Sequence, residues 1–231
     1  MRYFMSKNLL LAVVFALGLA AIGWIVVGYV GSNPLGMAVA LLIGACYLAG
    51  ASELFRYRQA TASLRHAVDE LGDTPADLGS WLQRLHPGLR HAVRLRVEGE
   101  RVALPAPAMT PYLVGLLVLL GMLGTLLGMM ATLRGTGMAL ASASDLAAIR
   151  GALAAPINGL GFALGTSIAG VASSAMLGLL SALVRRERLQ AVQALDAKIA
   201  TTLRVHSQAH RREESFRLLQ QQAAAMPALV D

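Results

Sequence analysis

Four long apolar segments, separated by polar stretches, dominate the pattern of this chain. None of them contains Asp, Glu, Lys, Arg or His. About 20 apolar residues are needed to cross the hydrocarbon core of a bilayer as a helix. The pattern therefore predicts four transmembrane helices, at residues 8–30, 35–52, about 112–133 and about 157–184.

The first two segments are predicted to form a transmembrane hairpin over residues 1–54. The first apolar run is longer than the roughly 7–15 residues of a cleavable signal-peptide core, so we expect a retained anchor. The sequence GSNP at 31–34 separates the two segments. Gly and Asn tolerate turn dihedrals and Pro34 cannot continue a helix from the residues before it.

A polar region, residues 55–109, separates the second and third apolar segments and is predicted to be a cytoplasmic domain. Apolar positions recur at helical spacing within 53–71, and Thr74-Pro75 is typical of a helix start. VRLRVEGERVAL, residues 93–104, alternates strictly around Glu98-Gly99. Such alternation predicts a small β-hairpin.

The last region, residues 185–231, is predicted to be a cytoplasmic helical tail that continues the fourth span as far as about Gln222. Its apolar residues repeat at helical spacing: Leu189, Val192, Leu195, Ile199 and Leu203. Two interpretations stay open for this stripe. It belongs either to a solvated amphipathic helix or to a bundle seam between subunits.

Charge defines the expected orientation. Of the 20 Lys and Arg residues, two precede the first span, eight lie within 53–109 and eight follow Val184. Only Arg134 and Arg150 lie in the loop between the third and fourth spans. Because cytoplasmic loops are enriched in Lys and Arg, we expect both termini in the cytoplasm, with the third and fourth helices extended into it.

Composition supports the membrane class. The chain is 56% apolar and 14% charged, whereas soluble domains carry about 25% charged residues. We therefore expect an all-α integral membrane protein in contact with the lipid bilayer. The net charge of +7 is explained by topology, so no nucleic-acid partner is expected.

Two hydroxyls stand out within the third and fourth spans. Thr125 and Ser167 each lie roughly 4–5 Å from the midpoint of their helix, toward the same side of the membrane. Thr166 lies beside Ser167 on a different face, and we count it with Thr125 and Ser167 as a candidate ion-pathway residue. The hydroxyls either bond back to helix carbonyls, as Ser and Thr often do in membranes, or face a polar path for ions.

Small residues are expected to pack the third and fourth helices closely, as in GxxxG motifs. Pro111 and Pro156 are expected near the start of these two helices, where proline is tolerated. The candidate packing residues are Gly121, Gly124, Gly128, Gly161, Gly165 and Gly170.

Catalytic chemistry is not expected. The spans hold no carboxylate to carry protons and no histidine to activate a serine, and Cys46 is a single cysteine. No Walker loop, HExxH or CxxC motif is present. We expect no enzyme, no metal and no cofactor. If the polar path carries ions, the titrating group must come from a partner.

Two segments resemble a known family: TPYLVGLLVLLGMLGTLLGM, residues 110–129, and ALAAPINGLGFALGTSIAGVASSAMLG, residues 152–178. They are similar to the third and fourth helices of the MotA/TolQ/ExbB proton-channel family, and the resemblance covers about residues 105–188. It implies that residues 110–184 are a pore-forming pair. Thr125 and Ser167 match the family's pore-facing threonines, and Thr166 precedes the second.

The resemblance also implies a function and an assembly. The expected protein is a subunit of a proton-driven motor in the bacterial inner membrane, a homopentamer around two copies of a single-span partner of the MotB/TolR/ExbD type. That partner supplies a membrane aspartate, and the ion is the proton, with sodium as the alternative. The long tail resembles ZorA-like motors of phage defence.

Flagellar drive is not expected, because no clear match to the charged rotor-contact motif of flagellar MotA is present. A second function stays open. In it, the chain is a non-conducting oligomeric scaffold that recruits cytoplasmic proteins through its helical tail.

Overall fold

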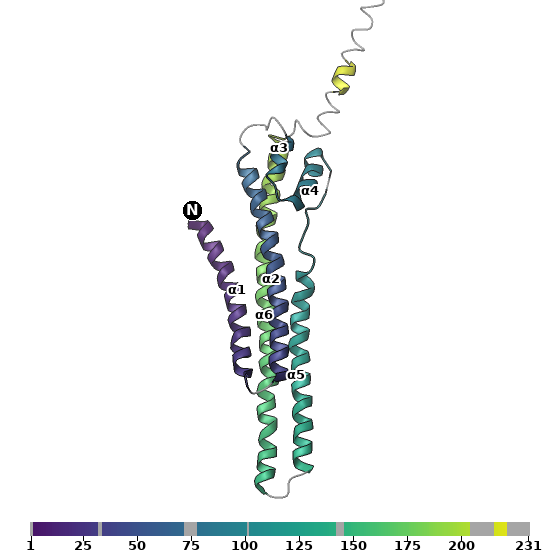
Figure 1. Cartoon of the computed structure of the whole chain (residues 1–231). Helices are drawn as coiled ribbons and strands as arrows, with labels where there is room; N and C mark the ends of the chain where they lie inside the picture. The colour runs from purple at the N-terminus through teal and green to yellow at the C-terminus, as the bar shows by residue number, and fades with distance from the viewer. Residues whose placement is uncertain are drawn as a thin grey trace, which may run out of the picture. The chain divides into compact units, whose positions relative to one another are not determined.

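The computed structural model describes residues 2–31, 34–71, 78–100, 102–141, 146–203 and 215–220. Within these residues the chain is helical and contains no strand (Figure 1). The helices are α1 (Arg2–Tyr29), α2 (Pro34–Asp69), α3 (Leu78–Gln83), α4 (Pro87–Glu98), α5 (Thr110–Ala141) and α6 (Leu146–Ala200). Residues 215–220 form a further short helix.

Four of these helices, α1, α2, α5 and α6, are long and apolar enough to cross a membrane. This finding confirms the four predicted spans and makes the chain a multi-pass membrane protein. Large apolar side chains such as Trp24 and Leu133 are exposed on these helices, at 82% and 72%. Lipid tails or neighbouring apolar helices are the surroundings that such faces require.

The chain divides into two compact units. The apolar unit comprises Met1–Phe55 and Pro107–Val184, and the polar unit comprises Arg56–Ala106 and Arg185–Asp231. Helices α2 and α6 each contribute residues to both units, because each changes from apolar to polar sequence along its length.

In the apolar unit, aromatic contacts join α1 to α2. The ring of Tyr47 stacks on Phe15 with centroids 5.8 Å apart, and its hydroxyl donates to the Phe15 carbonyl oxygen at 3.1 Å. Tyr29 packs near Ala40 at the other end of the pair. The two helices are therefore antiparallel, and Gly31, with φ +77°, lies in the connection between them.

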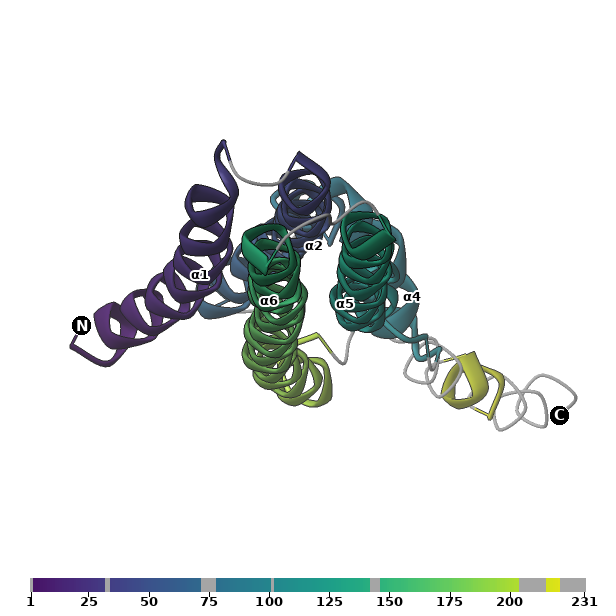
Figure 2. The same cartoon turned by 90° about the horizontal axis from the view of Figure 1, so that it is seen from below.

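Helix α6 contacts α5 on one side and α1 on another (Figure 2). The contact with α1 is made where Gly165 faces the hydroxyl of Tyr29. The contact with α5 runs through glycines and is described below as part of the candidate site.

The polar unit has its own hydrophobic core, formed by α3, α4 and the polar-unit parts of α2 and α6. Trp81 lies within it and donates its indole N–H to the Ala67 carbonyl oxygen at 2.9 Å. The ammonium of Lys198 donates to the Leu71 carbonyl oxygen at 2.6 Å. The largest fully buried core side chains are Leu64, Leu85, Leu89, Val93, Val97, Leu195 and Leu203.

The predicted β-hairpin at 93–104 is wrong, because its first half belongs to helix α4. The helix has strong end signals: His86 caps it, Pro87 opens it, and Gly99 closes it with φ +104°. Its buried residues follow helical rather than alternating spacing, and they are Leu89, Ala92, Val93 and Val97. Five alternating residues were too few to separate the two periods.

Two predictions for the third and fourth helices also need correction, the extension of the third helix into the polar region and the place of Pro156 in the fourth. The third span does not extend into the polar segment before it: α5 begins at Thr110, with Pro111 near its start as expected, and continues past the predicted end to Ala141. The prolines of PAPAMTP prevent an earlier start. Helix α6 begins at Leu146, so Pro156 lies inside it and does not mark its start.

The fourth span continues into the polar sequence as predicted, and α6 ends at Ala200. Within the predicted apolar stripe, Leu195 and Leu203 are buried, whereas Leu189 is exposed. Residues 204–214 and 221–231 of the predicted helical tail lie outside the described residues.

Candidate functional site

Helices α5 and α6 cross with their backbones in contact. A Cβ atom placed on Gly170 would lie 2.7 Å from the Cα of Gly121 and 2.6 Å from the carbonyl oxygen of Leu117. A Cβ on Gly121 would in turn lie 3.1 Å from the Cα of Gly170. These distances leave no room for a side chain, so Gly121 and Gly170 allow the close approach.

The neighbouring glycines differ in what they contact. A Cβ on Gly124 would lie 2.5 Å from Oγ1 and 2.7 Å from Cβ of Thr166, so these two residues pack directly together. Gly165 accommodates the Tyr29 hydroxyl, and Gly128 is buried. A Cβ on Gly161 would meet no atom within 4 Å, so this predicted packing residue makes no close contact within the described part of the chain.

The three candidate hydroxyls have different surroundings. Thr125 is partly exposed and donates to the Met122 carbonyl oxygen at 2.5 Å. Thr166 is fully buried and donates to the Ala163 carbonyl oxygen at 3.0 Å. Ser167 is half-buried, and its hydroxyl makes no hydrogen bond to the residues that the structure describes.

The glycine contacts bring the two hydroxyl-bearing segments together. Thr125 follows Gly124, which packs on Thr166, and the Cα of Ser167 would lie 3.4 Å from a Cβ on Gly121. Thr125 and Ser167 are therefore within about one helical turn of each other along the helix axes. Neutral hydroxyls donate and accept hydrogen bonds but do not titrate near neutral pH, so they can solvate an ion but not carry its proton.

A carboxylate that the sequence reasoning missed holds the start of α5. Glu53 of α2 accepts hydrogen bonds from the backbone N–H groups of Ala108 and Met109, both at 3.0 Å, and of Thr110 at 2.7 Å. The Thr110 hydroxyl donates to the same carboxylate at 2.6 Å. Thr110 is the first residue of α5, whose N–H group has no partner within the helix, and Ala108 and Met109 directly precede it, so Glu53 caps the start of the helix that carries Thr125.

The only sequence signal for this cap was an acidic residue directly after an apolar span. Glu53 and Thr110 are 57 positions apart, and no local pattern connects them. Thr110 is itself fully buried, so the capped end of α5 is fixed by packing as well as by hydrogen bonds.

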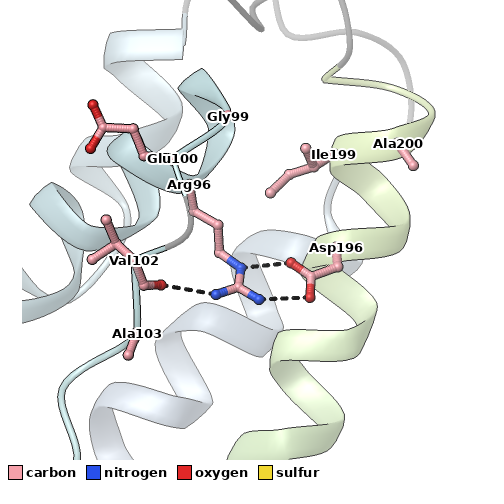
Figure 3. Close-up of a pocket in the computed structure, with 8 residues that line it drawn as sticks. All are labelled: Arg96, Gly99, Glu100, Val102, Ala103, Asp196, Ile199 and Ala200. Atoms are coloured by element: carbon pink, nitrogen blue, oxygen red, sulfur yellow. Dashed lines mark hydrogen bonds and ion pairs between the residues drawn. The ribbon is translucent and has the colours of Figure 1, made fainter.

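The polar unit contains an open pocket of about 580 Å³ (Figure 3). In it, Arg96 donates from Nε and Nη2 to both carboxylate oxygens of Asp196, at 2.7 and 2.9 Å, and from Nη1 to the Val102 carbonyl oxygen at 2.9 Å. The hydrogen bond to Asp196 raises the pKa of Arg96. Because these groups already bond one another, the arrangement is typical of a structural ion pair.

No group of three His, Cys, Asp or Glu side chains that would hold a metal ion is found within the described residues. Comparison with protein-family models and with curated protein sequences finds no match for this chain.

Proposed function

We propose that the chain is the pore-forming subunit of a proton-driven motor in the bacterial inner membrane. In this proposal a ring of five copies surrounds two copies of a single-span partner. The partner supplies a membrane aspartate, and ion flow past it drives mechanical work. The basis for the assembly is the resemblance of residues 105–188 to the MotA/TolQ/ExbB family.

The observation that carries the proposal is the glycine crossing of α5 and α6, with the hydroxyls of Thr125 and Ser167 beside it. A hydroxyl without a partner costs about 1–3 kcal/mol when it is buried in an apolar environment. Ser167, which has no hydrogen bond within the described residues, would recover that cost if it faced water or a polar partner group. A hydrated path supplies such a partner.

The hydroxyls alone cannot carry protons, because the predicted spans contain no Asp, Glu, Lys, Arg or His. The proposed division of roles follows from this composition. Thr125 and Ser167 line the path and solvate the ion, and the partner's aspartate binds and releases the proton. Thr166, which is buried against Gly124, keeps α5 and α6 in register and does not line the path.

A second function, a non-conducting scaffold, is favoured by one specific observation. The hydroxyls of Thr125 and Thr166 both bond to carbonyls of their own helices, at 2.5 and 3.0 Å. Such bonds satisfy a hydroxyl without any polar path. In this alternative the glycines only assemble the oligomer, and the polar unit recruits cytoplasmic proteins.

The double substitution Thr125→Val with Ser167→Ala distinguishes the two functions, since it removes both hydroxyls while keeping most of the volume. We would co-express the chain with a single-span protein of the MotB/TolR/ExbD type, purify the complex and measure proton uptake into vesicles. The motor proposal predicts normal assembly and at least a tenfold loss of proton flux, the equivalent of about 1.4 kcal/mol.

The matched control is Thr132→Val, because Thr132 also lies on α5 and bonds back to the Gly128 carbonyl oxygen at 2.6 Å. It should leave flux unchanged. If the double variant assembles and conducts like the control, the hydroxyls serve only packing and do not line the path. If the wild type itself conducts no faster than vesicles without protein, the scaffold function replaces the motor.

A further inference from the structure

Tyr29 of α1 contacts α6 at the height of the candidate site. Its side chain is buried, and its hydroxyl lies where α6 has no side chain, at Gly165. A Cβ on Gly165 would overlap with this oxygen and would lie 3.0 Å from Cζ of the same ring. The backbone N–H of Thr166 donates to the hydroxyl. The contact between α1 and α6 is therefore made by one polar group that fits a glycine.

Gly165 and the two residues after it point in three different directions, because consecutive residues of a helix are turned by about 100° around its axis. Gly165 faces Tyr29 of α1, and Thr166 packs on Gly124 of α5. Ser167 is turned by about 200° from Gly165, so its side chain is directed away from α1. This side chain is half-buried, and its hydroxyl makes no hydrogen bond to the described residues.

The two contacts together fix the rotation of α6, which lies between α1 and α5 (Figure 2). A helix that touches one neighbour can roll over it, whereas contacts on two faces prevent this motion. The Tyr29 ring is itself held by packing near Ala40 of α2, and a tyrosine side chain has only two torsion angles with which to move. The direction in which Ser167 points therefore depends on the Tyr29 hydroxyl.

We propose that Tyr29 is a positioning residue for the ion path. Its hydroxyl, seated at Gly165, holds α6 in the rotation that turns Ser167 toward the path. Tyr29 lies on the opposite side of α6 from Ser167, so it does not line the path and acts only through the helix. The inference rests on the proposed role of Ser167 and extends the site to α1, a helix that supplied no candidate residue from the sequence.

The reactivity of a cysteine in place of Ser167 tests the proposal without a measurement of conduction. Cys46 is the only cysteine of the chain, so Cys46→Ala combined with Ser167→Cys gives a single reporter thiol. A charged, water-soluble methanethiosulfonate reagent reacts with the thiolate, which forms only where the thiol contacts water. The rate of this reaction would be measured on the full chain in membranes of the expressing cells.

Gly165→Ala should slow the reaction of the reporter thiol at least fivefold, because the new methyl group displaces the Tyr29 hydroxyl and rotates α6. The addition of Tyr29→Phe should restore most of the rate, since the clashing atom is the hydroxyl oxygen. With Gly165 in place, Tyr29→Phe should instead slow the reaction about two- to fivefold through loss of the hydrogen bond. General damage to the fold would not produce this reversal of sign.

The matched controls are Gly18→Ala and Tyr47→Phe. The Tyr47 hydroxyl also lies at a glycine, Gly18, and donates to the Phe15 carbonyl oxygen at 3.1 Å. This contact joins α1 to α2 and does not involve α6. Both controls should leave the reaction rate of the reporter thiol unchanged.

Equal reaction rates in the Gly165→Ala and Gly18→Ala chains would overturn the proposal, and so would a Gly165→Ala rate that Tyr29→Phe does not raise. Either result leaves Ser167 in contact with water and refutes only the role of Tyr29. A reporter thiol that does not react in the reference chain would refute the hydrated path itself, and the positioning role with it.

Discussion

Substitution of Gly170 by alanine tests whether the contact between α5 and α6 is as close as the structure indicates. The new Cβ atom would lie 2.6 Å from the Leu117 carbonyl oxygen, and 2.7 and 3.0 Å from the Cα and N atoms of Gly121. All three are backbone atoms, which cannot rotate away. Carbon atoms normally approach to about 3.5–4.0 Å, so the helices must separate by about 1 Å.

The magnitude follows from two opposing contributions. Overpacking of a close contact costs about 1–3 kcal/mol. Replacement of glycine by alanine in a helix recovers about 0.4–1 kcal/mol, because the unfolded chain loses freedom. We expect Gly170→Ala to lower the free energy of unfolding by about 1–2 kcal/mol, or the midpoint by roughly 2–8 °C for a chain of this size.

The control is Gly161→Ala on the same helix, where a Cβ would meet no atom within 4 Å. It should be neutral or slightly stabilising. Thermal unfolding in detergent, followed by tryptophan fluorescence, compares the two variants with wild type. If Gly170→Ala is as stable as Gly161→Ala, the helices do not touch at Gly121 and Gly170, and the account of the crossing is wrong.

Two further predictions concern polar contacts. Glu53→Gln should raise deuterium exchange at residues 108–113 about tenfold, because the backbone N–H groups there lose a charged acceptor and the new amide places an N–H donor beside them. The control Glu100→Gln should leave this exchange unchanged, and equal exchange in the two variants would refute the cap. Asp196→Asn should lower the free energy of unfolding of the polar unit by about 1 kcal/mol, since the ion pair with Arg96 is bidentate but partly exposed. The control Asp69→Asn should change it by less than about 0.5 kcal/mol when both variants are measured by thermal unfolding.

The four long helices were predictable because a spanning segment has to be apolar over its whole length, and a run of about 20 apolar residues can be recognised directly in the sequence. The glycine contacts were predictable as a group, since small residues at four-residue steps favour close packing. Which glycines meet a neighbour was not predictable. Gly161 and Gly170 look alike in sequence, and only the crossing point of α5 and α6 separates them.

Two further features, the Glu53 cap and the burial of Arg188, were not predictable because each depends on a contact between residues far apart in the sequence. The Glu53 cap joins positions more than 50 residues apart, and the burial of Arg188 depends on the ring of Tyr57 from another helix. The error at α4 had a local cause. VRLRV matches both a strand and an amphipathic helix, and the signals that favoured the helix were His86-Pro87 before it and Gly99 after it.

Proton flux through the wild-type complex tests the central claim most directly. The chain and the proposed single-span partner would be purified together, reconstituted into vesicles that enclose a pH-sensitive dye, and exposed to an imposed membrane potential. The account predicts dye acidification that disappears when the partner's membrane aspartate is replaced by asparagine. Acidification no faster than in vesicles without protein, or flux that persists without the aspartate, would contradict it.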